Sequence, residues 1–86
     1  MKPRKTLERI LGGTRNVRFV DLVRLVEAFG FRLSRVQGSH HIFTRAGVPE
    51  LVNLQDVHGE AKPYQVRQFL SLVEKYNLQF TDDDQP

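Results

Sequence analysis

Residues 31–54 read FRLSRVQGSHHIFTRAGVPELVNL, and this stretch decides the fold. It contains three segments with the alternation or the β-branched and aromatic content of strands, separated by two short segments that contain the Gly, Ser and Pro residues typical of turns. Three consecutive strands with short links predict an antiparallel three-stranded sheet. The predicted strands are 31–36, 40–45 and 51–54, and the predicted turns are 37–39 and 46–49.

Amphipathic helices are predicted on both sides of this stretch. Apolar residues recur at intervals of three and four residues over 19–29 and again over 66–76, which places one apolar stripe along each helix. Both helices can then cover one face of the sheet and leave the other face open, as a binding protein needs. The pattern predicts an α+β fold of the order α-β-β-β-α.

The ends of these helices have recognisable residues. Asn16 is expected to cap the first helix and Gly30 to end it. Pro63 suits the first position of the last helix, where its missing N–H costs nothing. Asn77 is expected just after that helix, with Leu78 folding back behind it, and residues 55–61 are expected to form a loop.

A further short helix is predicted at residues 6–11, with Thr6 as its N-cap and Gly12-Gly13 as its end. Because it is short and stands before two glycines, we expect it to be loosely attached. The polar, acidic C-terminus is expected to be disordered. The predicted boundaries are a single domain at 1–81, with a core at 16–78 and an N-terminal extension at 1–15, and an acidic tail at 82–86.

The composition narrows the possible functions. The 86 residues contain no cysteine, which excludes disulfides, a thiolate metal site and a cysteine nucleophile. Three of the ten acidic residues are Asp82, Asp83 and Asp84, so the rest of the chain has 13 basic residues against seven acidic ones. This excess favours a polyanionic partner, although it also serves solubility. No apolar run is long enough for a signal peptide or a membrane span, so we expect a cytoplasmic protein.

The adjacent histidines His40 and His41 are the clearest chemical feature. Successive strand residues point to opposite faces, so one of the two must face outward. Gly38 lets a phosphate backbone approach closely, and Ser39 offers a hydroxyl and an N–H. Histidine titrates near neutral pH, which suits the removal of a proton from an RNA 2′-hydroxyl. The alternative is a pair of half-exposed histidines that bond to the neighbouring backbone.

Basic residues elsewhere extend this interpretation. Lys62 stands directly before a helix that begins with proline, and a helix N-terminus with an added positive charge holds phosphate well. Arg32 and Arg67 are further candidates for phosphate contacts. A metal site at His58 and Asp56 with one of the paired histidines is less well supported, because adjacent strand histidines diverge and no helical His-x-x-x-His pair is present. We therefore predict no metal and no cofactor.

Three motifs follow one another along the chain, namely Gly30-Phe31, Gly38-Ser39-His40-His41-Ile42-Phe43 and Lys62-Pro63. In this order they resemble the HicA-type mRNA interferase toxins, also called the YcfA-like family. The resemblance covers about residues 19–77 and implies a double-stranded-RNA-binding-domain-like α-β-β-β-α fold. It also implies a type II toxin, an endoribonuclease that cleaves mRNA independently of translation and is inhibited by a HicB-type antitoxin.

The resemblance further implies that His40, which follows Gly-Ser, is the catalytic residue. RNA phosphates are then expected at Gly38, Ser39, Lys62, Arg67 and Arg32, and the antitoxin is expected to cover the His40 face. The segment 53–59 lacks the Pro-x-His of many family members, so His58 is assigned no role. Two alternatives stay open, namely a non-catalytic RNA-binding module and a subunit that acts mainly through a partner protein.

Overall fold

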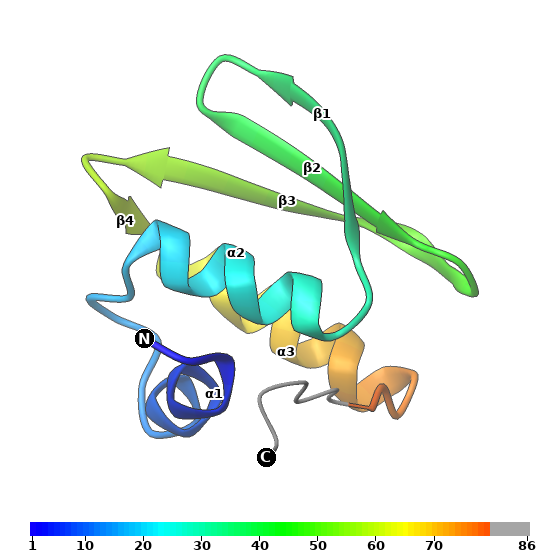
Figure 1. Cartoon of the computed structure of the whole chain (residues 1–86), viewed down its shortest axis with the longest axis horizontal. Helices are drawn as coiled ribbons and strands as arrows, with labels where there is room; N and C mark the ends of the chain where they lie inside the picture. The colour runs from blue at the N-terminus through cyan, green and yellow to red at the C-terminus, as the bar shows by residue number, and fades with distance from the viewer. Residues whose placement is uncertain (80–86) are drawn as a thin grey trace.

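The computed structural model describes residues 1–79, in which three helices and four strands follow one another along the chain (Figure 1). The sheet is antiparallel with strand order β1-β2-β3-β4. The predicted tail at 82–86 and the predicted domain end at 81 lie outside the described residues. The elements are α1 (Pro3–Leu11), α2 (Phe19–Ala28), β1 (Arg32–Gln37), β2 (His40–Arg45), β3 (Val48–Val57), β4 (Glu60–Ala61) and α3 (Pro63–Lys75).

The α+β fold and its antiparallel sheet are as predicted, but the sheet has four strands in place of three. Strand β3 continues to Val57, and the chain folds back through His58 and Gly59 into β4. Both turn residues have positive φ values, 53° and 86°, as a type I′ hairpin turn requires. The segment predicted as a loop at 55–61 is therefore mostly a hairpin.

The short strand β4 depends on a segment far away in the sequence. The Ala61 N–H donates to the Val17 carbonyl at 2.8 Å, and the Phe19 N–H donates to the Gly59 carbonyl at 2.9 Å. These bonds hold β4 beside the residues that lead into α2. A pattern of apolar and polar residues contains no trace of such a pairing, which explains why the fourth strand was not predicted.

Helices α2 and α3 cover one face of the sheet, and both pack on β3 (Figure 1). Helix α1 packs against α2 on the side away from the sheet. None of the helices in this described part of the chain is long and apolar enough to cross a membrane. The largest fully buried side chains of the core are those of Phe31, Phe43, Phe69, Ile10, Leu22, Leu25 and Leu54.

Helices α2 and α3 end as predicted, in Schellman motifs. Gly30 has φ +92°, and its N–H donates to the Glu27 carbonyl at 2.9 Å. Asn77 has φ 49°, and the N–H of Leu78 donates back to the Val73 carbonyl at 2.9 Å. A left-handed residue at this position lets the chain reverse while it satisfies the last carbonyls of the helix.

The predicted N-caps are wrong. Helix α2 begins at Phe19 with Arg18 as its N-cap, while Asn16 lies in the preceding loop with φ 59°. Helix α1 begins earlier than predicted, at Pro3, because proline is well suited to the first helical position. Thr6 is consequently buried in the second turn of α1.

The expected loose attachment of α1 is also wrong. Thr6 and Ile10 are each 1% exposed, and Leu7 packs against the same core. These residues are three and four positions apart, so they form one stripe that lies on α2. The N-terminal helix is therefore part of the packed structure.

Candidate functional site

The turn between β1 and β2 consists of Gly38 and Ser39, because Gln37 pairs with His40. Gly38 has φ +60° and Ser39 is not left-handed, which is the pattern of a type II′ turn with glycine at its first central position. A Cβ added at Gly38 would meet no atom within 4 Å. The surface above this turn is thus open to a ligand.

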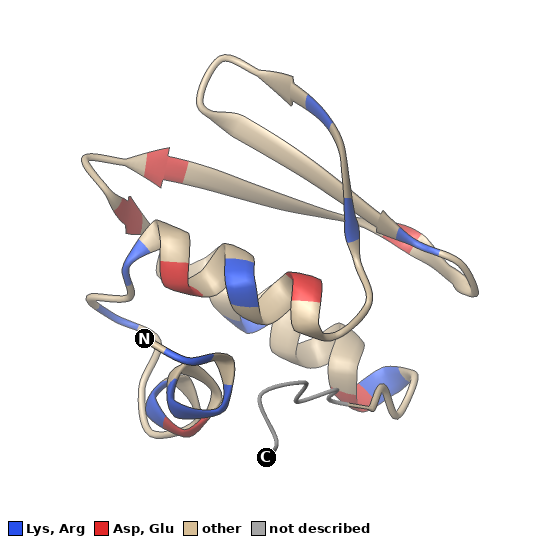
Figure 2. Cartoon of the chain, viewed as in Figure 1, with Lys and Arg blue, Asp and Glu red and all other residues tan. Residues whose placement is uncertain are grey.

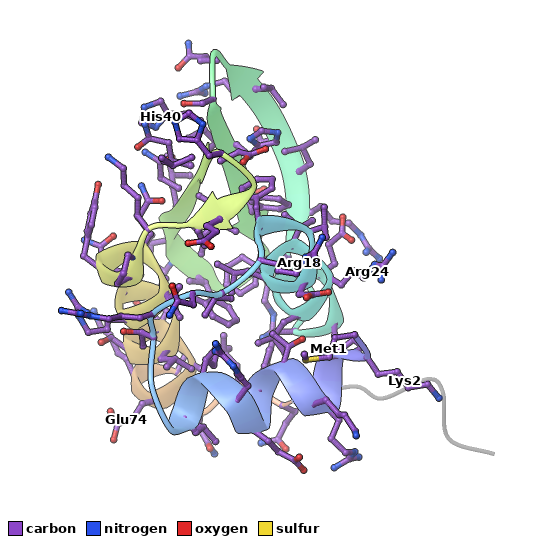
Figure 3. All side chains as sticks on the ribbon, turned by 90° about the vertical axis from the view of Figure 1, so that its left-hand side faces the viewer. Met1, Lys2, Arg18, Arg24, His40 and Glu74 are labelled. Carbon is purple, nitrogen blue, oxygen red and sulfur yellow. The ribbon has the colours of Figure 1, made fainter. Side chains whose placement is uncertain are left out.

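The two adjacent histidines lie on opposite faces of β2. His41 pairs with Leu54 and faces the helices, where its ring centroid is 4.8 Å from that of Phe19. Its Nδ1–H donates to the Ser39 carbonyl at 3.2 Å. His40 lies on the face that the helices leave open, and Figure 3 shows it projecting to the opposite side from Arg24 of α2.

His40 is held by a side chain from the neighbouring strand. Its Nδ1 lies 3.2 Å from Oδ1 of Asn53 on β3. The amide oxygen can only accept, so Nδ1 is the donor, and in the neutral ring with this tautomer the lone pair is on Nε2. Asn53 was missing from the candidates, because it pairs with Ile42 and reaches His40 only diagonally. That relationship depends on strand register, which the sequence does not reveal.

The first turn of α3 lies next to the strand pair that carries His40. His40 is opposite Gln55, and the Gln55 N–H donates to Oε1 of the buried Gln65 at 2.7 Å. Gln65 Nε2 in turn donates to the Tyr64 hydroxyl at 3.3 Å, and the Lys62 ammonium lies 6.0 Å from the Tyr64 ring centroid. Tyr64 and Gln65 thus connect β3 to Lys62, which was predicted to bind phosphate. Neither residue was a candidate from the sequence.

Helices α2 and α3 both begin at the end of the molecule where the β1–β2 turn and β4 lie (Figure 1). Helix α3 begins at Pro63 as predicted, and its N-cap Lys62 makes no side-chain capping bond. A helix N-terminus carries partial positive charge that favours anions, and this applies to α3, whose first turn contains no acidic residue, more than to α2, whose first turn contains Asp21.

The structure does not bring Arg32 and Arg67 to His40. Arg32 pairs with Thr44, four residues along β2 from His40, which corresponds to about 13 Å at the rise of a strand. Arg67 Nη1 donates to Thr14 Oγ1 at 3.2 Å, in the loop between α1 and α2. Both side chains are exposed, but they lie away from the histidine.

His58 and Asp56, two residues of the alternative metal site, form part of the β3–β4 hairpin. His58 occupies the first position of the β3–β4 turn, and Asp56 Oδ1 accepts the Gly59 N–H at 2.8 Å across that turn. Within residues 1–79, no three His, Cys, Asp or Glu side chains are grouped so as to hold a metal ion. The absence of a cofactor stays a prediction.

Two helices on one face of an antiparallel sheet, with a half-exposed histidine on the other, define an α+β domain of the double-stranded-RNA-binding type. Among protein-family models, the one described as HicA toxin of bacterial toxin-antitoxin matches residues 19–74. Because this match covers well over half of the chain, the chain belongs to the HicA toxin family, the toxins of bacterial toxin–antitoxin pairs. Comparisons with curated proteins and with solved structures gave no match.

Proposed function

We propose that this toxin is a metal-independent endoribonuclease that cleaves mRNA in the cytoplasm and so arrests translation and growth. The observation that carries this proposal is the state of His40. Its ring lies on the open face of the sheet, and the bond from Nδ1 to Asn53 leaves Nε2 available as a proton acceptor. Membership of the HicA toxin family supports the same conclusion.

The proposed reaction uses His40 for proton transfer. Nε2 removes the proton of a ribose 2′-hydroxyl, and the 2′-oxygen attacks the adjacent phosphorus. The bond from phosphorus to the 5′-oxygen breaks, and that oxygen takes up a proton from the imidazolium or from water. The products are a 2′,3′-cyclic phosphate and a 5′-hydroxyl. One P–O bond forms and one breaks, so the reaction needs no oxidant, reductant or metal.

The phosphate is held by groups at the same end of the sheet. Gly38 leaves the surface above the turn open, and Ser39 offers its hydroxyl and N–H groups beside it. Lys62 adds positive charge at the start of α3, next to the exposed Tyr64. Such charge and preorganised donors stabilise the additional negative charge that develops on the phosphorane. Arg32 and Arg67 would contact RNA farther from the scissile bond.

Inhibition follows from the same geometry. A HicB-type antitoxin that lies over the open sheet face would cover His40 and the β1–β2 turn. An acidic partner surface would also complement the basic surface of the toxin and speed its association. The antitoxin thereby competes with mRNA for one surface.

A non-catalytic RNA-binding module is the second candidate function, and one observation favours it. Among residues 1–79, His40 has no hydrogen bond to a carboxylate or to a second imidazole, since its bonding partner is an amide. Efficient proton transfer usually involves both an acid and a base. RNA that is retarded but remains intact with the purified toxin would favour this second function.

Inducible expression in bacteria tests the toxin proposal. Wild-type protein is expected to stop growth and to deplete total mRNA, whereas His40→Ala is expected to do neither at the same protein level. Antitoxin co-expression should restore growth. Equal, unaffected growth with both proteins would remove the proposed function.

A further inference from the structure

A second cluster of basic side chains surrounds the loop between α1 and α2. Arg9 on α1 donates from Nη1 and Nη2 to the Arg15 carbonyl, each at 3.3 Å, and from Nη2 to the Asn16 carbonyl at 3.1 Å. Arg67 on α3 donates to Thr14 Oγ1 at 3.2 Å. Two helices thus direct guanidinium groups to one loop that itself contains an arginine.

These charges are not neutralised by acidic side chains. Between residues 1 and 79, neither Arg9, Arg15 nor Arg67 forms an ion pair with a carboxylate, whereas Lys75 pairs with Glu50 at 2.8 Å. Figure 2 shows the concentration of Lys and Arg on α1 and the loop that follows it. Guanidinium groups that converge without counter-charges favour an anionic ligand.

The backbone of the loop adds further donors. The N–H groups of Thr14, Arg15 and Asn16 donate to no other described residue. A Cβ at Gly13 would meet no atom within 4 Å, so a ligand can approach the chain there. An open hollow of about 410 Å³ lies over this loop. Successive free N–H groups beside arginines are a common way to bind phosphate. The hollow is lined by Arg9, Gly12, Gly13, Thr14 and Arg15.

Helix α3 connects the loop to the residue proposed to bind the scissile phosphate, because both Arg67 and Lys62 lie at the start of this helix. Lys62 and Arg67 are five residues apart at the start of α3, about 7.5 Å along the helix axis and about 140° around it, so an RNA strand that contacts both would wrap around the start of this helix. Arg67 then reaches Thr14 in the loop. The basic groups therefore continue from the His40 end of the sheet, along the start of α3, to the arginine cluster.

We propose that Arg9, Arg15 and Arg67, with the N–H groups of residues 14–16, bind the phosphodiester backbone of RNA outside the scissile phosphate. This inference rests on the proposed function and deepens it, because it gives the substrate a path across the molecule. Arg9 and Arg15 precede residues 19–74, so the family match does not include them. The cluster would contribute affinity for RNA and no proton transfer.

Binding of a fluorescent single-stranded RNA with 2′-O-methyl groups at every ribose tests the inference, because such RNA cannot undergo cleavage. Its dissociation constant is measured by anisotropy over a range of salt concentrations for wild type, Arg15→Gln, Arg67→Gln and Arg67→Lys. Arg24→Gln is the matched control, since Arg24 is an exposed arginine of α2 outside the cluster. Thermal unfolding of each variant separates a lost contact from a lost fold.

Each Gln variant is expected to reduce the slope of log affinity against log salt by about 0.7, which is about fivefold weaker binding at roughly 0.1 M salt. Arg67→Lys should keep the slope, and Arg24→Gln should resemble wild type. Folded Gln variants that bind RNA as tightly as Arg24→Gln would overturn the inference. The inference would also be overturned if Arg15→Gln weakened the binding of polyglutamate and left the binding of RNA unchanged. In that case the cluster would bind an acidic protein.

The same proteins distinguish this inference from the proposed function. If wild type leaves unmodified RNA intact while the Gln variants still lose affinity for methylated RNA, the nuclease proposal fails and the inference stands. If wild type cleaves RNA and the variants bind as the control does, the inference fails alone.

Discussion

Nδ1 of His40 lies 3.2 Å from Oδ1 of Asn53, so an amide on β3 fixes the ring of the histidine proposed to be catalytic. The contact spans adjacent strands on the face that the helices leave open. It selects the tautomer in which Nε2 is free to accept a proton. In the proposed mechanism Asn53 is therefore a positioning residue, and this role can be separated from a purely structural one.

Asn53→Ala is expected to lower kcat for RNA cleavage about fivefold, equivalent to a hydrogen bond of about 1 kcal/mol, with little change in RNA affinity. Asn53→Asp should retain most activity and shift the pH–rate profile to higher pH, because a carboxylate stabilises the protonated imidazole. Single-turnover kinetics over a pH series make the comparison. A change in RNA affinity alone, with kcat and the profile unchanged, would contradict the positioning role.

The elements that could be predicted from the sequence are those determined by local residues. Each of these features depends on residues close by in the sequence. They are the apolar stripe of α2, the alternation of His40 and His41 in β2, and the left-handed residues Gly30 and Asn77. The strand β4 depends on hydrogen bonds to Val17, far away in the chain, and was therefore missed.

The geometry of the candidate site was predictable in part for the same reason. Gly38, Ser39 and His40 follow one another, so their proximity is given by the chain. Asn53 requires knowledge of which residues pair across β2 and β3. Arg67 was predicted to contact phosphate because it is a basic residue near the start of the last helix, and the sequence did not reveal that its side chain bonds to Thr14 in the loop between α1 and α2.

Gly30→Ala should destabilise the fold more than Gly38→Ala. Both glycines have positive φ, which costs other residues about 1 kcal/mol or more. A Cβ at Gly30 would also lie 3.3 Å from Arg45 Nε, whereas a Cβ at Gly38 meets nothing within 4 Å. Urea unfolding of the two variants gives the difference directly. If both variants lost the same free energy of unfolding, the Arg45 side chain would move away from the added Cβ without an energetic cost.

Gln65→Met is expected to lower the free energy of unfolding by about 1–3 kcal/mol. Gln65 is 2% exposed and accepts the Gln55 N–H at 2.7 Å, so methionine would leave that donor without its acceptor. Gln68→Met on the exposed side of α3 is the control, and urea unfolding is the measurement. Equal stability of both variants would mean that water replaces the amide.

Glu50 should make the fold sensitive to acid. Its Oε2 lies 2.8 Å from Lys75 Nζ and its Oε1 accepts the Tyr76 hydroxyl at 2.6 Å. These bonds, that of Lys75 first, lower the pKa of Glu50 from 4.5 to about 2. The contribution of this carboxylate to stability is therefore complete above pH 4.5 and is lost as the pH falls through about 2.

Comparison of wild type with Glu50→Gln tests this dependence. The difference in their free energies of unfolding should be constant near neutral pH, decrease below pH 4.5 and vanish near pH 2. Glu74→Gln, on the exposed face of α3, controls for the change in net charge. A difference that stays constant down to pH 2 would mean that the bonds to Lys75 and Tyr76 do not depend on ionised Glu50.

The rate at which purified His40→Ala cleaves labelled RNA in the presence of a chelator tests the central claim most directly. His58→Asn is the matched control, because asparagine tolerates the left-handed conformation of that turn. Wild type and His58→Asn should produce 2′,3′-cyclic phosphate ends, while folded His40→Ala should bind RNA and cleave it at least about a hundredfold more slowly. Cleavage by His40→Ala at the wild-type rate would contradict the account.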